Sequence, residues 1–192
     1  MKKALIGYGG HAREVLQQIG IDIPCFVDDQ FLTDKTFPLS ELDVEKYEVM
    51  VAIANPTDRK NIIESLPKNT KFFTFIHPTA LILDKNVKIG KGSFIGAYSI
   101  LTTNITIGNH CILNRSNHVG HDSIIGDYFS AMPGSIVSGN CNIGNEVYLG
   151  TNSSVREKIN ISDNVLVGLN SGIVSNINES GVYVGLPAKK IK

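Results

Sequence analysis

His121 and Asp122 stand side by side in this chain of 192 residues, and a bare backbone, Gly139, follows 18 positions after the histidine. An imidazole can accept a proton from an attacking nucleophile. An unobstructed backbone N–H can stabilise the oxyanion that forms when a thioester is attacked. Asp122 could orient the ring and stabilise its charged form. If the fold brings these three residues together, they suit acyl transfer.

A six-residue repeat predicts that they do meet, because a hexapeptide β-helix has three flat sides per coil of 18 residues. Positions 18 apart then lie directly above one another, which places His121 over Gly139. Contact between His121 and Asp122 further requires a corner of the coil at that point. Fifteen aliphatic residues define the repeat without a slip: Ile89, Ile95, Leu101, Ile107, Leu113, Val119, Ile125, Ala131, Val137, Ile143, Leu149, Val155, Ile161, Val167 and Ile173.

The other histidines are weaker candidates for a general base. His118 is the rival, but it directly precedes Val119, which faces inward, so packing or substrate contact is its expected role. We expect His110 to lie on the plain outer surface, and also His77, which stands beside a proline.

A second column of residues falls on a different side of the prism from His121. Thr151 and Leu169 are 18 apart, and Ser130 lies on the same side one coil earlier. These residues cannot easily meet His121 within one chain. In a trimer, one chain's first side could face the next chain's other side and enclose a groove. The pattern therefore predicts a homotrimer with active sites between subunits.

Residues 1–76 alternate short apolar runs with helical patterns, which predicts a small, parallel, Rossmann-like α/β domain. His77-Pro78 marks the boundary, so residues 77–192 form the β-helix domain with a C-terminal tail. We expect helices from about 12 to 19, with Gly20 able to cap the first, and from 59 to 66, after Asn55 as a possible N-cap. Strands are expected at residues 4–6, 23–27, 49–53 and 72–76.

The first turn of this domain spells G-x-G-x-x-A over residues 7–12, and Asp28 and Asp29 follow about twenty residues later, as in dinucleotide-binding sites. Gly9 and Gly10 would let backbone N–H groups approach a phosphate, and an aspartate could bind ribose hydroxyls. Only one nucleotide fits a domain of this size. The alternative is a tight turn with an exposed His11 and ordinary loop aspartates.

Composition excludes several classes of partner. The formal net charge is zero and no basic run occurs, which disfavours nucleic acid and anionic membrane surfaces. No window approaches the roughly 18 apolar residues of a membrane span, and the N-terminus does not resemble a signal peptide. The three cysteines show no metal-binding spacing. We therefore expect a soluble, cytoplasmic protein without a bound metal.

Taken together, these features resemble the bacterial sialic-acid O-acetyltransferase / nucleotide-amino-sugar N-acetyltransferase family across essentially the whole chain. The resemblance rests on the Gly9-Gly10-His11 turn, Asp28-Asp29, the hexads, His121-Asp122 and the closing residues 185–189. It implies a left-handed parallel β-helix, a homotrimer, acetyl-CoA as co-substrate and an N-terminal domain that binds the nucleotide of a UDP-sugar.

The resemblance also assigns roles to individual positions. The catalytic base falls on His121, and the acid that raises its basicity falls on Asp122, in place of a glutamate in the family. Substrate contacts fall on Gly9, Gly10, His11, Asp28, Asp29, Ala54 and Asn55. Acetyl-CoA contacts fall on Gly139, Thr151, Leu169 and Ser130, the last in place of a histidine.

The expected function is therefore acetyl-CoA-dependent N-acetylation of a nucleotide-linked, expected UDP-linked, 4-amino-dideoxy sugar for surface glycan synthesis. O-acetylation of sialic acid is the first alternative. The second is a non-catalytic subunit that only binds a nucleotide sugar.

Overall fold

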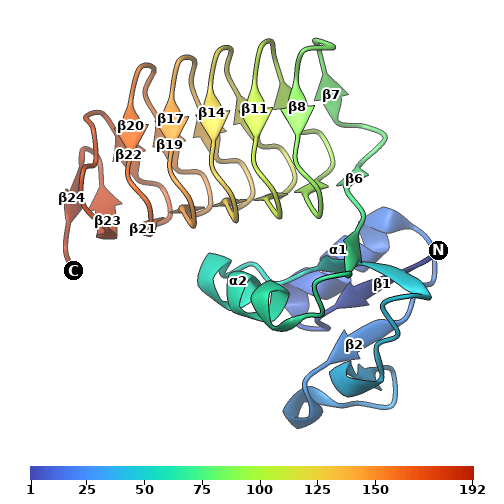
Figure 1. Cartoon of the computed structure of the whole chain (residues 1–192). Helices are drawn as coiled ribbons and strands as arrows, with labels where there is room; N and C mark the ends of the chain where they lie inside the picture. The colour runs from blue at the N-terminus through green and yellow to red at the C-terminus, as the bar shows by residue number, and fades with distance from the viewer.

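The computed structural model describes all residues from 1 to 192 and shows two parts, a small α/β domain and a long prism (Figure 1). Neither α-helix is long and apolar enough to cross a membrane. The α/β domain contains β1 (Lys2–Ile6), α1 (Gly10–Ile19), β2 (Cys25–Val27), the 3₁₀ turn η1 (Asp29–Phe31), β3 (Phe37–Pro38), the 3₁₀ turn η2 (Leu39–Glu41), β4 (Tyr47–Val51), α2 (Pro56–Ser65) and β5 (Lys71–Phe72).

The five strands of the α/β domain are parallel and lie in the order β3-β2-β1-β4-β5. The chain runs outward from β1 to β3 and then returns to place β4 on the other side of β1. Ligands of such sheets bind at the carboxyl ends of the strands where the order reverses. The segments that follow β1, β2 and β4 are those that hold residues 9–11, 28–29 and 54–55. The predicted substrate residues thus share one edge of the sheet.

Both helices have the predicted caps. Gly20 ends α1 in the left-handed conformation, with φ of 71°, and donates its N–H to the carbonyl of Leu16. The side chain of Asn55 accepts hydrogen bonds from the N–H groups of Thr57 (2.9 Å) and Asp58 (3.2 Å), which leaves Pro56 as the first residue of α2. Asn55 is therefore an N-cap, as its position before a proline predicts.

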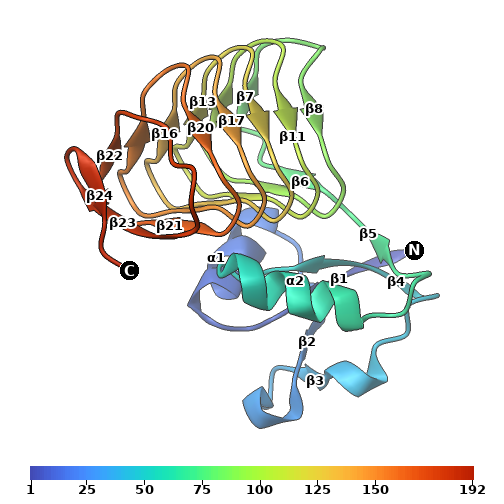
Figure 2. The same ribbon diagram turned by 60° about the vertical axis from the view of Figure 1, so that its left-hand side comes forward.

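The prism consists of three sheets, which we name by their first strands and whose strands are all parallel except the last strand of the chain (Figure 2). The β6 side contains β6 (Phe75–Ile76), β9 (Phe94–Ile95), β12 (Ile112–Leu113), β15 (Ser130–Ala131), β18 (Tyr148–Leu149), β21 (Val165–Val167) and the terminal hairpin β23 (Gly181–Gly185) and β24 (Ala188–Lys190). The β7 side contains β7 (Leu81–Ile82), β10 (Ile100–Leu101), β13 (His118–Val119), β16 (Ile136–Val137), β19 (Ser154–Val155) and β22 (Gly172–Ile173). The β8 side contains β8 (Lys88–Ile89), β11 (Thr106–Ile107), β14 (Ile124–Ile125), β17 (Asn142–Ile143) and β20 (Asn160–Ile161).

The hexad aliphatics form the core of the prism. Val119, for example, pairs with Leu101 and with Val137, each 18 residues away. Fourteen of the fifteen belong to one buried cluster of 22 residues, and Ile89 packs against its edge. Each coil therefore covers the core of the next, which confirms the predicted combination of an α/β domain and a hexapeptide β-helix.

The strand predicted for residues 72–76 is wrong as a single element. Phe72 ends in the α/β sheet, whereas Phe75 already pairs with Phe94 in the prism, and their rings stack at 5.8 Å. The chain leaves one sheet and enters the other before it reaches His77. The physical reason is that Phe75 completes an aromatic pair on the outside of the prism.

The α/β domain packs against the outer face of the β6 side, with α1 and α2 next to the coils (Figures 1 and 2). Outward-facing Phe94 and Ile112 belong to the same buried cluster as Leu5 and Val15 of the domain. Phe94 and Ile112 each directly precede an inward-facing aliphatic residue of the prism. The core of the domain therefore continues onto the surface of the prism.

Arg59 of α2 joins the two parts and is completely buried. Its guanidinium has five N–H donors, and they reach three carbonyls of the prism and two of the domain. The prism carbonyls are those of His110 (2.9 Å), Tyr128 (2.6 Å) and Phe129 (3.1 Å). The domain carbonyls are those of Ile53 and Ala54. Burial lowers the pKa of Arg59 to about 10, so the group stays charged at neutral pH.

His110 is buried beneath the domain, so its predicted place on the plain surface is wrong. Only 4% of the residue is exposed. Its ring meets Phe72 edge-on at 4.6 Å and stacks on Tyr128 at 5.6 Å. Its Nδ1 atom is buried without a partner. Burial, together with the nearby charges of Lys91 and Arg59, lowers the pKa of His110 to about 4.

Because His110 and His11 both have a lowered pKa in the folded chain, we expect acid to weaken the folded structure. Burial also lowers the pKa of His11 to about 4, from a usual value of 6.5. Between these pH values the unfolded chain binds more protons, so the free energy of unfolding should fall as the pH drops from about 6.5 towards about 4. The loss should reach about 3 kcal/mol for each ring.

Urea denaturation at several pH values would measure this loss. The double variant His11→Gln/His110→Phe should show a much weaker dependence on pH, whereas His118→Gln, at an exposed histidine, should keep the dependence of the unmodified chain. An unchanged dependence in the double variant would contradict the assignment to these two rings.

Candidate active site

The predicted catalytic pair is formed at a corner of the prism that follows β13. Asp122 has a left-handed backbone, with φ of 59°, which turns its side chain back towards its neighbour. Its Oδ2 lies 2.8 Å from Nδ1 of His121. A carboxylate only accepts hydrogen bonds, so Nδ1 carries the proton and Nε2 keeps its lone pair. The hydrogen bonds from Asn104 and then from His121 hold the pKa of Asp122 below its usual range.

Gly139 lies directly beneath the imidazole, as the spacing of 18 predicts. A Cβ atom at this position would stand 2.7 Å from Nε2 and 2.8 Å from Cε1 of His121. The Gly139 N–H makes no hydrogen bond within the chain, although the residue is buried under the ring. Buried N–H groups are nearly always paired. The site therefore combines a base with a spare donor.

Adding one methyl group at Gly139 should separate activity from stability. In Gly139→Ala the new Cβ would displace the His121 ring, which can rotate, so the melting temperature should change little. Misplacing a reacting group by about 1 Å can lower the rate by about 100-fold. We therefore expect a fall in kcat of that order in a thiol-release assay. A variant with normal kcat would show that the close approach has no catalytic role.

The rival base, His118, lies on β13 itself and is exposed. It pairs with Ile100 and Ile136 in the ladder and makes no side-chain hydrogen bond. Nothing orients its ring, in contrast to His121. The geometry favours His121 as the base.

The turn after β1 is open around its glycines. Gly9 precedes α1 with an extended backbone, and a Cβ at Gly9 or Gly10 would meet no atom within 4 Å. His11 is half-buried, with its ring edge-on to Phe94 at 6.4 Å and its Nε2 buried without a partner. The turn therefore has room for a ligand next to the helix N-terminus.

Asp28 and Asp29 lie at a different cavity, of about 490 Å³, with residues of η2 and the end of α2. The carboxylate of Asp28 accepts a hydrogen bond from the N–H of Gln30 and caps η1. Gly9, Gly10 and Ala54 do not line this cavity. The substrate residues predicted from the sequence share a sheet edge, but the structure does not bring them into one pocket.

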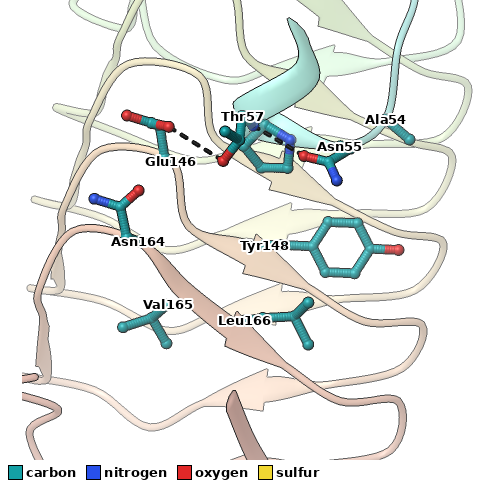
Figure 3. Close-up of a pocket in the computed structure, with 9 residues that line it drawn as sticks. Ala54, Asn55, Thr57, Glu146, Tyr148, Asn164, Val165 and Leu166 are labelled. Atoms are coloured by element: carbon teal, nitrogen blue, oxygen red, sulfur yellow. Dashed lines mark hydrogen bonds between the residues drawn. The ribbon is translucent and has the colours of Figure 1, made fainter. Parts of the chain in front are cut away.

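Ala54 and Asn55 line a second cavity, of about 450 Å³, between the start of α2 and the β6 side of the prism (Figure 3). Glu146 borders it and holds α2 in place. Its carboxylate lies 2.5 Å from Nζ of Lys60 and accepts a hydrogen bond from the hydroxyl of Thr57 at 3.3 Å.

Tyr148 and Leu166 project towards this cavity from β18 and β21 (Figure 3). They were not among the predicted site residues. The spacing contained the signal, since they stand 18 and 36 positions after Ser130, in the same outward column.

Ser130 is not available to a ligand in this chain, because it is completely buried and its hydroxyl donates to the carbonyl of Ala54 at 2.7 Å. Thr151 and Leu169 follow β18 and β21 at the opposite end of those strands from Glu146 and Asn164, and both are exposed. His121 follows β13 on the β7 side instead. Thr151 and Leu169 thus stand at the corner between the β6 and β7 sides, whereas His121 stands at the corner between the β7 and β8 sides, so one chain places them at different corners of the prism.

Comparison with known proteins agrees with this architecture. No family model matches the chain. GDP-perosamine N-acetyltransferase of Escherichia coli O157:H7 is 29% identical over 174 residues, which cover 81% of this chain and 78% of the relative. The acetyltransferase domain of PglB from Neisseria gonorrhoeae FA1090, solved in complex with acetyl coenzyme A, is 26% identical, with a TM-score of 0.85 over 99% of this chain and 98% of that domain.

A third similar protein is WeeI from Acinetobacter baumannii AYE, which is 25% identical with a TM-score of 0.89 over the whole of both chains. These similarities include the α/β domain as well as the β-helix, so they cover more than the repeat. They support the left-handed form of the β-helix that the resemblance implied. The chain is an acetyl-CoA-dependent acetyltransferase, and over nearly its whole length it is similar to the PglB/PerB/WeeI-type hexapeptide-repeat sugar N-acetyltransferases with an N-terminal domain.

Proposed function

We propose that this chain transfers the acetyl group of acetyl-CoA to the amino group of a nucleotide-linked amino sugar. The observation that carries the proposal is the His121 imidazole, bonded through Nδ1 to Asp122 and seated against the backbone of Gly139, whose N–H is unpaired. The names of the relatives, one for a GDP-linked amino sugar and one bound to acetyl coenzyme A, support the two substrates.

The chemistry follows from the tautomer of His121. The neutral amine of the sugar attacks the thioester carbonyl carbon, and Nε2 of His121 takes the proton that the amine loses. The carbonyl oxygen gains negative charge, which the Gly139 N–H stabilises by a hydrogen bond. The C–S bond then breaks, and the thiolate of coenzyme A leaves and regains a proton from the imidazolium. Asp122 stabilises the charged ring in between.

The proposed acceptor is a UDP-linked 4-amino sugar, held by the α/β domain at the carboxyl ends of β1, β2 and β4. Because the E. coli relative is a GDP-perosamine N-acetyltransferase, a GDP-linked amino sugar is the main alternative to this acceptor. Thr151 and Leu169 are the proposed contacts for the coenzyme on the exposed part of the prism. Gly9, Gly10, His11, Asp28, Asp29, Ala54 and Asn55 are the proposed contacts for the nucleotide sugar.

The proposed assembly is a homotrimer in which each site lies between two subunits. The His121 corner and the cavity at Ala54 lie on different sides of one prism, so a site that uses both needs two chains. Mixing His121→Ala subunits with Tyr148→Arg subunits tests this. Mixed trimers should regain part of the activity that each variant lacks alone, whereas a monomer in sedimentation would contradict the proposal.

A thiol-release assay over UDP-, GDP- and dTDP-linked 4-amino sugars and free sialic acid tests the reaction. We expect release with at least one nucleotide amino sugar and the highest kcat/KM with a UDP-linked one. Preference for a GDP-linked sugar would overturn the choice of uridine as the nucleoside of the substrate. Preference for sialic acid would indicate O-acetylation, and failure to bind coenzyme A would indicate a non-catalytic subunit.

A further inference from the structure

We propose that Asn104 is a positioning residue that fixes the Asp122 carboxylate against His121. The two oxygens of Asp122 have different partners. Oδ2 faces the ring of His121 at 2.8 Å, and Oδ1 accepts a hydrogen bond from the side-chain amide of Asn104 at 2.7 Å. This inference deepens the proposed function, because it rests on His121 as the base.

The prism places Asn104 directly above Asp122, one coil earlier. Both residues stand at the same corner with left-handed backbones, with φ of 54° at Asn104 and 59° at Asp122. Asparagine and aspartate tolerate this conformation better than most residues. The side chains therefore stack 18 residues apart without distorting the coil.

Asn104 is itself anchored from the coil before. Oδ2 of Asp84 accepts a hydrogen bond from the Asn104 N–H at 3.2 Å and another from the hydroxyl of Thr103. The Asp122 N–H in turn bonds the carbonyl of Thr103 at 3.1 Å. A continuous set of hydrogen bonds thus joins three coils and ends at the catalytic ring.

The consequence for catalysis is orientation. A free aspartate can rotate about two bonds, and either oxygen can turn away from its neighbour. With Oδ1 held by Asn104, Oδ2 stays on Nδ1 of His121, and this keeps the lone pair on Nε2. The amide donor also lowers the pKa of Asp122, so the carboxylate remains charged. His121 and Asp122 are both about half exposed, so burial does not supply this orientation.

Two variants of Asn104 test the proposal. Asn104→Asp keeps the shape and the tolerance of the backbone but removes the donor, and Asn104→Gly removes the side chain without straining the left-handed turn. We expect kcat to fall roughly tenfold in both, with little change in KM for either substrate. In Asn104→Asp the added carboxylate stabilises the imidazolium, so the acid limb of the kcat profile should move to higher pH.

Asn140→Gly is the matched control. Asn140 occupies the corner one coil below Asp122, with φ of 58°, and its exposed side chain makes no hydrogen bond. This variant should keep normal kcat and the normal pH profile. An equal loss of kcat in Asn140→Gly would assign the effect to the backbone of the turn and overturn the proposal.

The role of Asn104 and the proposed function fail in different ways. If His121→Ala abolishes turnover while both Asn104 variants keep the kcat and the pH profile of the unmodified chain, only the positioning role is overturned. If His121→Ala keeps turnover, the general base is wrong and the positioning role is overturned with it. A melting temperature within experimental error in all variants would show that these changes do not reflect unfolding.

Discussion

Replacing His121 by alanine should lower kcat/KM for acetyl transfer by about 10²- to 10⁴-fold, the usual contribution of a general base. The amine must lose a proton as the new amide forms, and Nε2 of His121 is the oriented acceptor at this corner. His121 is about half exposed, so its removal should leave the melting temperature unchanged. Thiol release measured at saturating acetyl-CoA would give the effect.

His118→Ala is the matched control for this prediction, because His118 is an exposed histidine three residues earlier, with no carboxylate partner. It should retain activity close to that of the unmodified chain. Asp122→Asn should have an intermediate effect, since the ring would remain but its tautomer would no longer be set by a carboxylate. If His118→Ala lost activity and His121→Ala did not, the two histidines would have exchanged roles.

Replacing Arg59 by methionine should lower the free energy of unfolding by about 3 to 5 kcal/mol, because it leaves buried carbonyls without donors at the contact between domain and prism. For a chain of this size the melting temperature should fall by roughly 10 °C. Arg59→Lys keeps the charge but has three donors in place of five. Its melting temperature should therefore lie between those of Arg59→Met and the unmodified chain. Thermal melts followed by circular dichroism would measure the change.

Arg115→Met provides the comparison, because Arg115 also joins the two parts of the molecule. Its guanidinium lies 3.1 Å from the carboxylate of Glu14, but both side chains are about half exposed. An exposed ion pair of this kind contributes at most about 1 kcal/mol. Equal losses in Arg59→Met and Arg115→Met would show that burial of the guanidinium is not what stabilises the contact.

The core of the prism and the position of the proposed catalytic pair could be predicted from the sequence. The six-residue period specifies which residues face inward, and the 18-residue coil specifies which lie above one another. Both properties follow from local pairing between adjacent coils, so they appear directly as spacing. The contact of His121 with Asp122 required a corner, and the left-handed backbone at Asp122 supplies it.

The contact between domain and prism could not be predicted in the same way, because it joins segments far apart in the sequence. His110 is one example: the repeat places it at a corner of the prism, where it would face solvent, and only docking of the domain buries it. Arg59 is a second example, since a cation on a short helix usually faces water and its burial is therefore not expected. A partial signal existed in the outward column that begins with Phe75, Phe94 and Ile112. The equivalent positions on the β8 side include Lys88, Thr106 and Asn142, which suit a solvated face.

The pairing of coils 18 residues apart has a consequence for how this chain can change. No side-chain bond holds Gly139 under His121; the count of residues between them does. One residue inserted or deleted between positions 122 and 138 would slide every later coil by one place, and an aliphatic side chain would leave the core or a different backbone atom would meet the ring. A whole coil added after Leu169 would leave the pair untouched. The number of residues between His121 and Gly139 is therefore constrained as strictly as the identity of those two residues.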